Sequence, residues 1–97
     1  MGIKVRENID IPGMMEFFCP GCGYYHSPTT KSKNLQGAQW TFNGNLEKPT
    51  FTPSILVSKD NPQYRCHSFV TDGRIQFLDD CFHELKNKTV DLPDWEF

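Results

Sequence analysis

The chain has 97 residues, of which 13% are aromatic and 23% charged, and its net charge is −2. This length predicts a single domain covering residues 1–97, and the small negative charge argues against broad electrostatic binding to nucleic acid. Abundant aromatic side chains, together with seven Pro and seven Gly, favour β-structure over a helical bundle.

The first residues, 1–7, contain no apolar run, so neither a signal peptide nor a membrane span is predicted there. We therefore expect a cytoplasmic protein without a membrane partner. Thiols stay reduced in the cytoplasm, and the four cysteines of the chain indicate a metal site rather than disulfides.

Residues 3–11 alternate apolar and polar side chains and predict a first strand or an extended arm. Residues 14–18 form a short apolar run that leads directly into the sequence Cys19-Pro20-Gly21-Cys22-Gly23. The proline fixes one backbone angle and the glycines permit a tight turn, so that backbone N–H groups can point at the sulfurs. This pentapeptide is typical of a zinc knuckle.

The middle of the chain predicts a polar loop and short strands. Residues 27–37 are rich in turn-forming residues and are the best candidate for a mobile loop. Residues 40–42 alternate as a strand, and Asn43-Gly44 after them is a strong hairpin signal. Flanking prolines argue against a central strand at residues 50–52, whereas residues 54–58 predict a short buried strand.

The clearest unit is a hairpin in which residues 64–71 and 74–78 flank Asp72-Gly73, a two-residue turn of type I′ composition. This turn sets the register of the two strands. The expected facing pairs are Val70 with Ile75, Ser68 with Phe77, and Cys66 with Asp79.

At the C-terminal end, Asp79 is expected to cap a short helix that continues to Lys86. Residues 89–93 predict a terminal strand, and Trp95 and Phe97 are expected to pack back on the body or to form an exposed apolar end. The predicted fold class is α+β but mostly β: a small, zinc-stapled antiparallel sheet of hairpins with one short C-terminal helix.

Four thiolates satisfy the tetrahedral geometry of structural Zn²⁺. Counting strand positions across the hairpin places Cys66 and Cys81 on the same side, so the predicted ligands are Cys19, Cys22, Cys66 and Cys81. Alternative sets replace one thiolate with His67 or His83. His26 is within reach of Cys22 in principle, but it follows two tyrosines that we expect to be buried.

No catalytic constellation is evident, and we predict that the chain is not an enzyme. Asp79 and Asp80 are adjacent at the expected helix start, where capping is their simplest role. Cys66 and His67 are neighbours on a strand, so their side chains point apart and cannot form a nucleophile–base pair. A zinc-dependent enzyme acting through His67 or His83 is the least favoured alternative.

Five blocks of the sequence resemble a family of small proteins from tailed bacteriophages and prophages, a domain family without an assigned function. Some members of that family are labelled ammonia monooxygenase, which does not suit a chain with no membrane span. The blocks are Phe18-Cys-Pro-Gly-Cys-Gly-x-x-His26, Trp40-x-Phe-Asn-Gly44, Glu47-x-Pro-Thr-Phe-x-Pro-Ser-Ile55, the stretch from Cys66 to His83, and Thr89-Val-Asp-Leu-Pro-x-Trp95.

The resemblance implies a phage origin and a zinc-type site, and it supplies no catalytic residues. The expected function is therefore protein–protein interaction by a phage-encoded structural-zinc protein, in the cytoplasm of an infected or lysogenic bacterial host. Its partner would be a host or phage protein, and inhibition of a defence system such as a CRISPR complex is one form of this function. The alternative is single-stranded nucleic-acid binding, in which aromatic side chains would stack on bases. The candidates for that stacking are Tyr24, Tyr25, Trp40 and Phe42.

Overall fold

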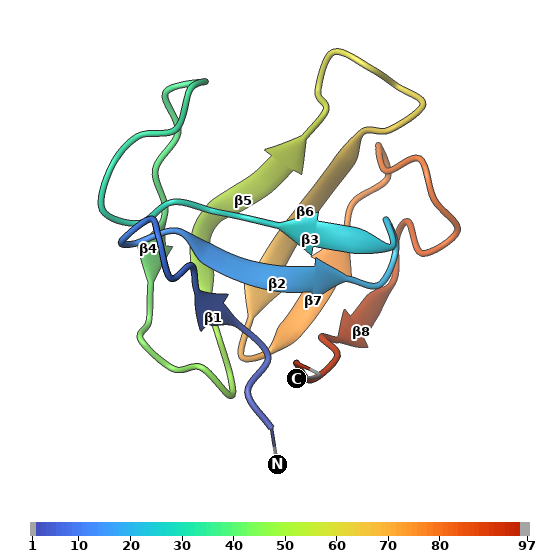
Figure 1. Cartoon of the computed structure of the whole chain (residues 1–97). Coiled ribbons are helices and arrows are strands. Elements are labelled where there is room, and N and C mark those ends of the chain that lie inside the picture. The colour runs from blue at the N-terminus through green and yellow to red at the C-terminus, as the bar shows by residue number, and fades with distance from the viewer. Residues whose placement is uncertain (1, 96–97) are drawn as a thin grey trace.

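The computed structural model describes residues 2–95 and arranges them as eight β-strands in two antiparallel sheets (Figure 1). No helix occurs within residues 2–95, and so none there could cross a membrane. The mostly-β prediction is therefore confirmed. The strands are β1 Arg6–Glu7, β2 Met15–Cys19, β3 Tyr24–His26, β4 Thr41–Phe42, β5 Phe51–Val57, β6 Cys66–Thr71, β7 Arg74–Phe77 and β8 Thr89–Asp91.

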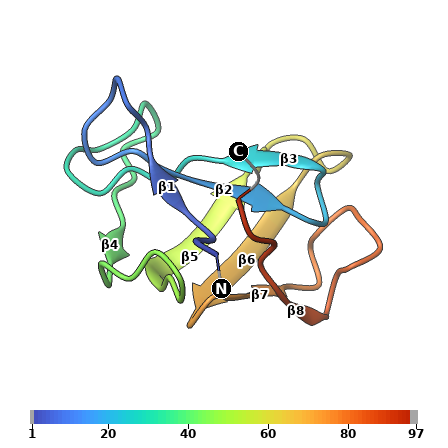
Figure 2. The same ribbon diagram turned by 60° about the horizontal axis from the view of Figure 1, so that its bottom comes forward.

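The smaller sheet has the strand order β1-β2-β3 and crosses over the larger sheet, whose order is β4-β5-β6-β7-β8 (Figures 1 and 2). In β2, residues 15, 17 and 19 are buried and the two between them are partly exposed, as expected for a strand with one face on the core. Phe17 stacks on Phe51 of the larger sheet with 6.1 Å between ring centroids. The core therefore lies between the two sheets.

The hairpin of β6 and β7 confirms most of the predicted register. Val70 pairs with Ile75 and Ser68 pairs with Phe77, and the turn residues Asp72 and Gly73 both have positive φ angles. Such angles are those of a type I′ turn. The expected pair of Cys66 with Asp79 does not form, because β7 ends at Phe77 and the chain turns away at Asp79.

Two predictions for the middle of the chain need correction. A hairpin of β4 and β5 does follow Phe42, but Asn43-Gly44 is not its two-residue turn, because Phe42 pairs with Phe51 and the whole of residues 43–50 connects the two strands. The Asn43 side chain instead accepts hydrogen bonds from the N–H groups of Asn45 and Thr50 inside that loop. Residues 50–52 run into β5, an inner strand, which accommodates its proline in an irregular stretch between Phe51 and Ile55.

The short C-terminal helix is also absent, because some backbone N–H groups after β7 donate to β6 and to the residue before it, and the bonds within the segment close only isolated turns. Leu78 N–H donates to the carbonyl of His67 (2.9 Å), and Phe82 N–H donates to the carbonyl of Arg65 (2.9 Å). The chain then forms isolated turns, with Asn87 in the left-handed region (φ 65°) just before β8. Asp79 and Asp80 therefore cap no helix.

The C-terminal segment packs back on the body, as one of the two expectations for it stated. The Trp95 indole N–H donates to the carbonyl of Glu16 (3.1 Å), and its ring stacks on Tyr25 with 4.9 Å between centroids. Phe97 lies outside the described residues.

Candidate active site and metal-binding cluster

Strand β6 carries two groups of side chains on its two faces. Cys66, Ser68 and Val70 are at most 1% exposed and face the smaller sheet. Because side chains alternate along a strand, His67 and Phe69 point to the outer face of the larger sheet. This arrangement confirms the prediction that the side chains of Cys66 and His67 point apart.

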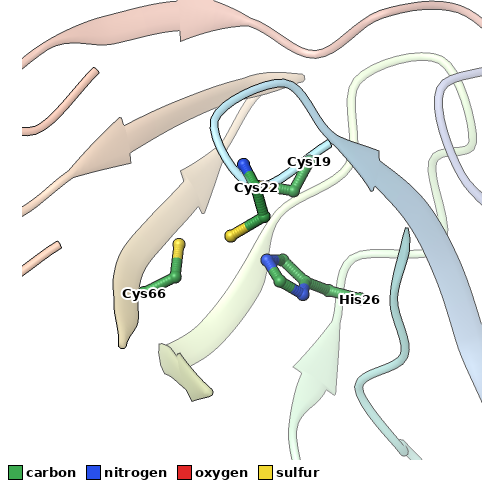
Figure 3. Close-up of side chains that lie close together, drawn as sticks. All are labelled: Cys19, Cys22, His26 and Cys66. Carbon is green, nitrogen blue, oxygen red and sulfur yellow. The ribbon is translucent and has the colours of Figure 1, made fainter. Parts of the chain in front are cut away.

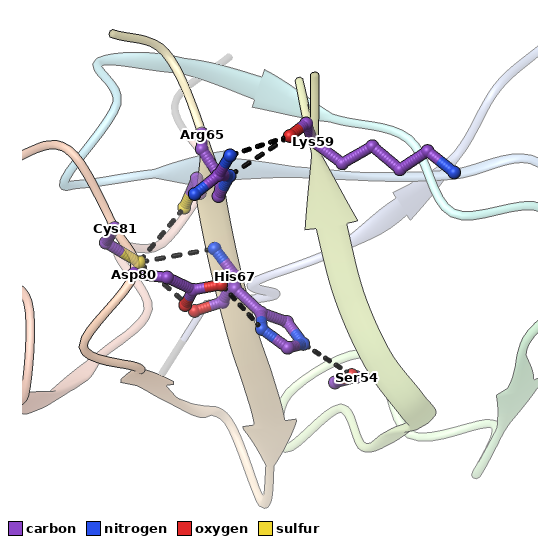
Figure 4. Close-up of polar contacts among 7 residues, drawn as sticks. Ser54, Lys59, Arg65, His67, Asp80 and Cys81 are labelled. Carbon is purple, nitrogen blue, oxygen red and sulfur yellow. Dashed lines mark hydrogen bonds and ion pairs between the residues drawn. The ribbon is translucent and has the colours of Figure 1, made fainter. Parts of the chain in front are cut away.

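On the outer face, His67 lies between a serine and an aspartate (Figure 4). Its Nε2 atom is 2.9 Å from Ser54 Oγ, and its Nδ1 atom is 3.2 Å from Asp80 Oδ2. When Nδ1 carries the ring proton and donates it to Asp80, Nε2 is free to accept a hydrogen bond from the Ser54 hydroxyl. Ser54, His67 and Asp80 thus form the hydrogen-bonded chain of a serine hydrolase triad.

Each member of the triad comes from a different element. Ser54 lies in β5 at the end of its irregular stretch, just before Ile55, and His67 is the second residue of β6. Asp80 follows β7 in the turn that replaces the expected helix. His67 and Asp80 side chains are 25% and 35% exposed, so the triad is open to solvent and to a substrate.

The neighbouring cysteine holds two of these segments together. The Cys81 thiol donates to the carbonyl of His67 (3.1 Å) and accepts from the His67 N–H (3.2 Å). Cys81 is 5% exposed and directly follows Asp80 in the chain. It therefore fixes the main chain beside the imidazole to the turn that carries the carboxylate.

On the inner face of β6, Cys66 meets the predicted knuckle and a histidine (Figure 3). The ligand atoms of Cys19, Cys22, His26 and Cys66 all lie within 4.8 Å of one another. Cys19 Sγ also accepts a hydrogen bond from the Cys22 N–H (3.4 Å), as predicted for the knuckle. The three thiols come from the end of β2 (Cys19), from the turn between β2 and β3 (Cys22) and from the start of β6 (Cys66).

The electrostatics of this cluster favour a cation. Hydrogen bonds from Cys22 and Cys66 hold the pKa of the Cys19 thiol far below its usual range. The pKa of Cys22 rises to about 12 and that of Cys66 is also raised, in each case chiefly through the hydrogen bond to Cys19. The Cys19 thiolate is thus stabilised while the neighbouring thiols stay protonated. If several of these thiols are to ionise together, a positive charge must lie between them.

His26 supplies a second argument for a metal. Its side chain is 3% exposed, and its Nε2 atom is buried without a hydrogen-bond partner among the described residues. One imidazole nitrogen beside three sulfurs is one of the donor sets that hold tetrahedral structural Zn²⁺. The residues present therefore fit a zinc ion.

The structure brings only part of the predicted thiolate set together in that group. Cys81 Sγ is 4.0 Å from Cys66 Sγ, but it belongs to a second group with Cys66 and His83. His83 Nε2 lies 3.5 Å from Cys66 Sγ, and burial lowers the pKa of this histidine. His67, an alternative ligand, lies outside both groups and contacts Ser54 and Asp80 instead.

The expectation that the tyrosines before His26 are buried was wrong. Tyr24 and Tyr25 are 42% and 51% exposed, whereas His26 is buried against Phe17 in an edge-to-face contact with 5.5 Å between centroids. Because β3 pairs with the edge of β2, its alternation points His26 inward and Tyr25 outward. The pairing of β3 with β2 is therefore what identifies His26 as a candidate ligand.

The outer-face serine and aspartate were also missed. Leu56 pairs with His67, and Ser54 precedes Leu56 by two residues, so strand alternation places Ser54 on the face of His67. The signal was hidden because the strand predicted at residues 54–58 was not assigned a neighbouring strand, and because Asp80 was assigned to a helix cap.

Comparison with known protein families supports this reading of the outer face as a hydrolase site. The sequence model of the family described as bacterial ubiquitination-like system serine protease (BubE) matches residues 3–78. The chain belongs to this family. The matched stretch contains Ser54 and His67 and ends two residues before Asp80. No curated protein and no solved structure matches the chain.

The family corrects the prediction that the chain is not an enzyme, because the description of the family is that of a serine protease. The prediction failed for an identifiable reason. Only cysteines, carboxylate pairs and metal motifs were tested as catalytic groups, and no serine was placed beside a histidine.

Proposed function

We propose that this protein is a serine protease in which Ser54 is the nucleophile, His67 the general base and Asp80 the residue that orients His67. The observation that carries the proposal is the continuous contact from Ser54 Oγ to His67 Nε2 (2.9 Å) and from His67 Nδ1 to Asp80 Oδ2 (3.2 Å). The family supplies an independent reason to expect serine chemistry.

The reaction follows from this geometry. Ser54 Oγ attacks the carbonyl carbon of a peptide bond while His67 Nε2 takes the hydroxyl proton. The imidazolium formed is stabilised by the Asp80 carboxylate, and it then gives its proton to the leaving amine as the C–N bond breaks. An ester between the substrate acyl group and Ser54 remains. Water attacks this ester with His67 again as base, and the free acid and the Ser54 hydroxyl are regenerated.

The family description places such a protease in a bacterial ubiquitination-like system. We therefore propose a protein component of such a system as the substrate. The shape of the site is compatible with a protein substrate, because Ser54 and His67 lie on a partly exposed sheet face with Asp80 in the adjoining turn.

A covalent probe tests the nucleophile directly. We expect a fluorophosphonate to add to the wild-type protein once, and peptide mapping to locate the adduct at Ser54. Ser54→Ala should abolish the adduct, whereas Ser27→Ala, an exposed serine near the same edge, should retain it. Labelling that persists in Ser54→Ala and is lost in another serine variant would refute the assignment.

For the inner face we propose a structural Zn²⁺ held by Cys19, Cys22, Cys66 and His26. The proposal is supported by the clustering of these ligand atoms within 4.8 Å and by the buried, unpartnered nitrogen of His26. Four protein ligands leave no open position, so the ion would supply stability and no chemistry to the triad. The set with Cys81 as the fourth ligand stays a prediction, and the geometry favours His26.

The phage origin, a location in the bacterial cytoplasm and the role in countering a host defence system remain predictions from the sequence. Capture of a host protein at stoichiometric level on the Ser54→Ala variant would support the last of these, because an inactive protease holds a partner without cleaving it. Single-strand nucleic-acid binding also stays a prediction. Such a function requires an affinity for single-stranded nucleic acid that falls steeply as the salt concentration rises.

A further inference from the structure

We propose that the substrate enters as an extended polypeptide strand along the free edge of β5 and that its main chain pairs with Leu56. This inference rests on the proposed role of Ser54. It concerns how the substrate is held, which the triad alone does not determine.

The edge of β5 is open over the half of the strand that contains Ser54. Strand β4 pairs with β5 only through Thr41 with Thr52 and Phe42 with Phe51. From Pro53 onward, no described strand covers that side, because the larger sheet has the order β4-β5-β6-β7-β8.

The hydrogen-bonding pattern shows which main-chain groups of β5 face this open edge. The carbonyl of His67 accepts from Leu78 and the N–H of His67 donates to Cys81, so both groups of His67 point away from β5. In an antiparallel ladder, Leu56 opposite His67 is then a non-hydrogen-bonded pair, and its own N–H and carbonyl point away from β6. Within residues 2–95, neither group has a hydrogen-bond partner.

A groove of about 580 Å³ lies along this edge. Its lining includes Ser54 and Leu56 on β5, and Ala38 and Trp40 on the segment before β4. The Trp40 indole N–H donates to the carbonyl of Ser54 (3.2 Å), which fixes this segment against the nucleophile. The reactive serine, the free main-chain pair and the groove therefore lie together.

The chemistry of the groove selects a polypeptide as its occupant. The free N–H and carbonyl of Leu56 match one residue of a peptide main chain, as in the addition of a strand to a sheet. Lysine and aspartate each occur once among the lining residues, as Lys59 and Asp60, so the charge is balanced and offers little to a polyanion. Because two residues of a strand span about 6–7 Å, the substrate residue that pairs with Leu56 should lie about two positions from the bond that is cleaved.

Two substrates separate this inference from the proposed function. p-Nitrophenyl acetate is too small to pair with Leu56 and reports the triad alone, whereas a peptide library prepared by digesting a bacterial proteome requires the groove. Leu56→Pro removes the free N–H, and proline is tolerated at a sheet edge. Leu56→Ala is the matched control, since it shortens the side chain and keeps the N–H.

We expect Leu56→Pro to retain ester hydrolysis and to lose about tenfold or more of peptide cleavage relative to Leu56→Ala. Equal peptide cleavage by the two variants would overturn the inference. Ester hydrolysis by the wild type without any peptide cleavage would also overturn it, while leaving the hydrolase triad intact. Failure of the wild type on both substrates, with no fluorophosphonate adduct, would refute the proposed function itself and this inference with it.

If Leu56→Pro loses ester hydrolysis as well, the proline has disturbed the triad. The inference is then tested with the wild-type protein and altered peptide substrates. A peptide that the wild type cleaves is resynthesised with single N-methyl groups at successive positions. We expect cleavage to be blocked at one position about two residues from the scissile bond and to be retained at its neighbours. Uniform tolerance to N-methylation would contradict strand pairing.

Discussion

The two faces of β6 show how one strand can serve two different chemistries. The inner face presents Cys66, which is 1% exposed and lies among sulfurs and a buried imidazole. The outer face presents His67, whose side chain is 25% exposed and contacts two oxygens. Since successive side chains of a strand point to opposite faces, a single step along the backbone separates the proposed metal site from the site of the proposed reaction.

The two faces of β6 are linked through Cys81. Cys81 Sγ lies 4.0 Å from Cys66 Sγ and is hydrogen-bonded to both main-chain groups of His67. The knuckle packs on the same region from the other side, since a Cβ added to Gly21 would lie 2.2 Å from the His83 ring. Variants on each face should therefore differ in what they change first: the stability of the fold on the inner face and the rate of hydrolysis on the outer face.

The largest effect is expected from the inner face. Cys19→Ser should release the metal and unfold much of the domain, because structural zinc contributes roughly 10 kcal/mol or more to folding in zinc-finger peptides. Zinc content by elemental analysis and thermal unfolding followed by circular dichroism measure the result. Ser54→Ala is the control and should keep both the metal and the melting temperature. If Cys19→Ser is as stable as wild type, the cluster has no structural role.

The outer face should respond in the opposite way. Asp80→Asn is expected to lower kcat by about 10³–10⁴-fold with little change in stability, because the amide no longer holds His67 in the tautomer that accepts a proton. Asp79→Asn, at the exposed neighbouring carboxylate, is the matched control and should retain activity. Fluorophosphonate labelling rates and unfolding curves measure the two properties. Equal losses in the two variants would show that Asp80 has no special role.

Substitution of Cys81, which links the two faces, should have a smaller effect, on the rate of hydrolysis and not on the metal content. Cys81→Ala removes the thiol that bonds to His67 and is expected to reduce kcat about tenfold, as one or two hydrogen bonds are lost. Because His26 is the proposed fourth ligand, Cys81→Ala should retain one zinc per chain, whereas His26→Ala should lose it. Cys81→Ser keeps a donor and an acceptor and should recover part of the rate. Loss of zinc in Cys81→Ala but not in His26→Ala would show that Cys81, and not His26, is the fourth ligand.

The sequence predicted the inner face better than the outer face, for physical reasons. The knuckle is local: its ligands are three residues apart, and the intervening Pro20 and Gly21 indicate the turn. Cys66 could be added because the Asp72-Gly73 turn fixes the register of its hairpin. The triad is non-local: its residues come from β5, β6 and the turn after β7, and no signal in the sequence pairs the strand predicted at residues 54–58 with the strand that carries His67.

His26 and Asp80 show the second limit of prediction from sequence. His26 becomes a candidate ligand only once β3 is known to pair with β2 and to turn this side chain inward. Asp80 reaches His67 because the chain after β7 bonds back to β6 instead of starting a helix. In both cases a tertiary pairing overrides the local pattern, and a single sequence carries little trace of it.

The smallest effect concerns the turn that assigns Cys66 and His67 to their faces. Gly73 has a φ of 78°, and a Cβ there would lie 3.2 Å from the carbonyl oxygen of Glu47. Gly73→Ala should therefore cost about 1–2 kcal/mol of unfolding free energy for the left-handed backbone, with an added contribution from this close approach. At Gly44 (φ 82°) a Cβ would meet no atom within 4 Å, so Gly44→Ala isolates the backbone cost.

The value of this variant is that it separates loss of stability from loss of register. If the hairpin keeps its register, Gly73→Ala should unfold at lower denaturant than Gly44→Ala while zinc content and kcat both stay at wild-type levels. If the register slips by one residue, Cys66 and His67 exchange faces, and the metal and the activity should disappear together. Retained zinc with lost activity fits neither outcome, and it would mean that the two faces are not set by the pairing of β6 with β7.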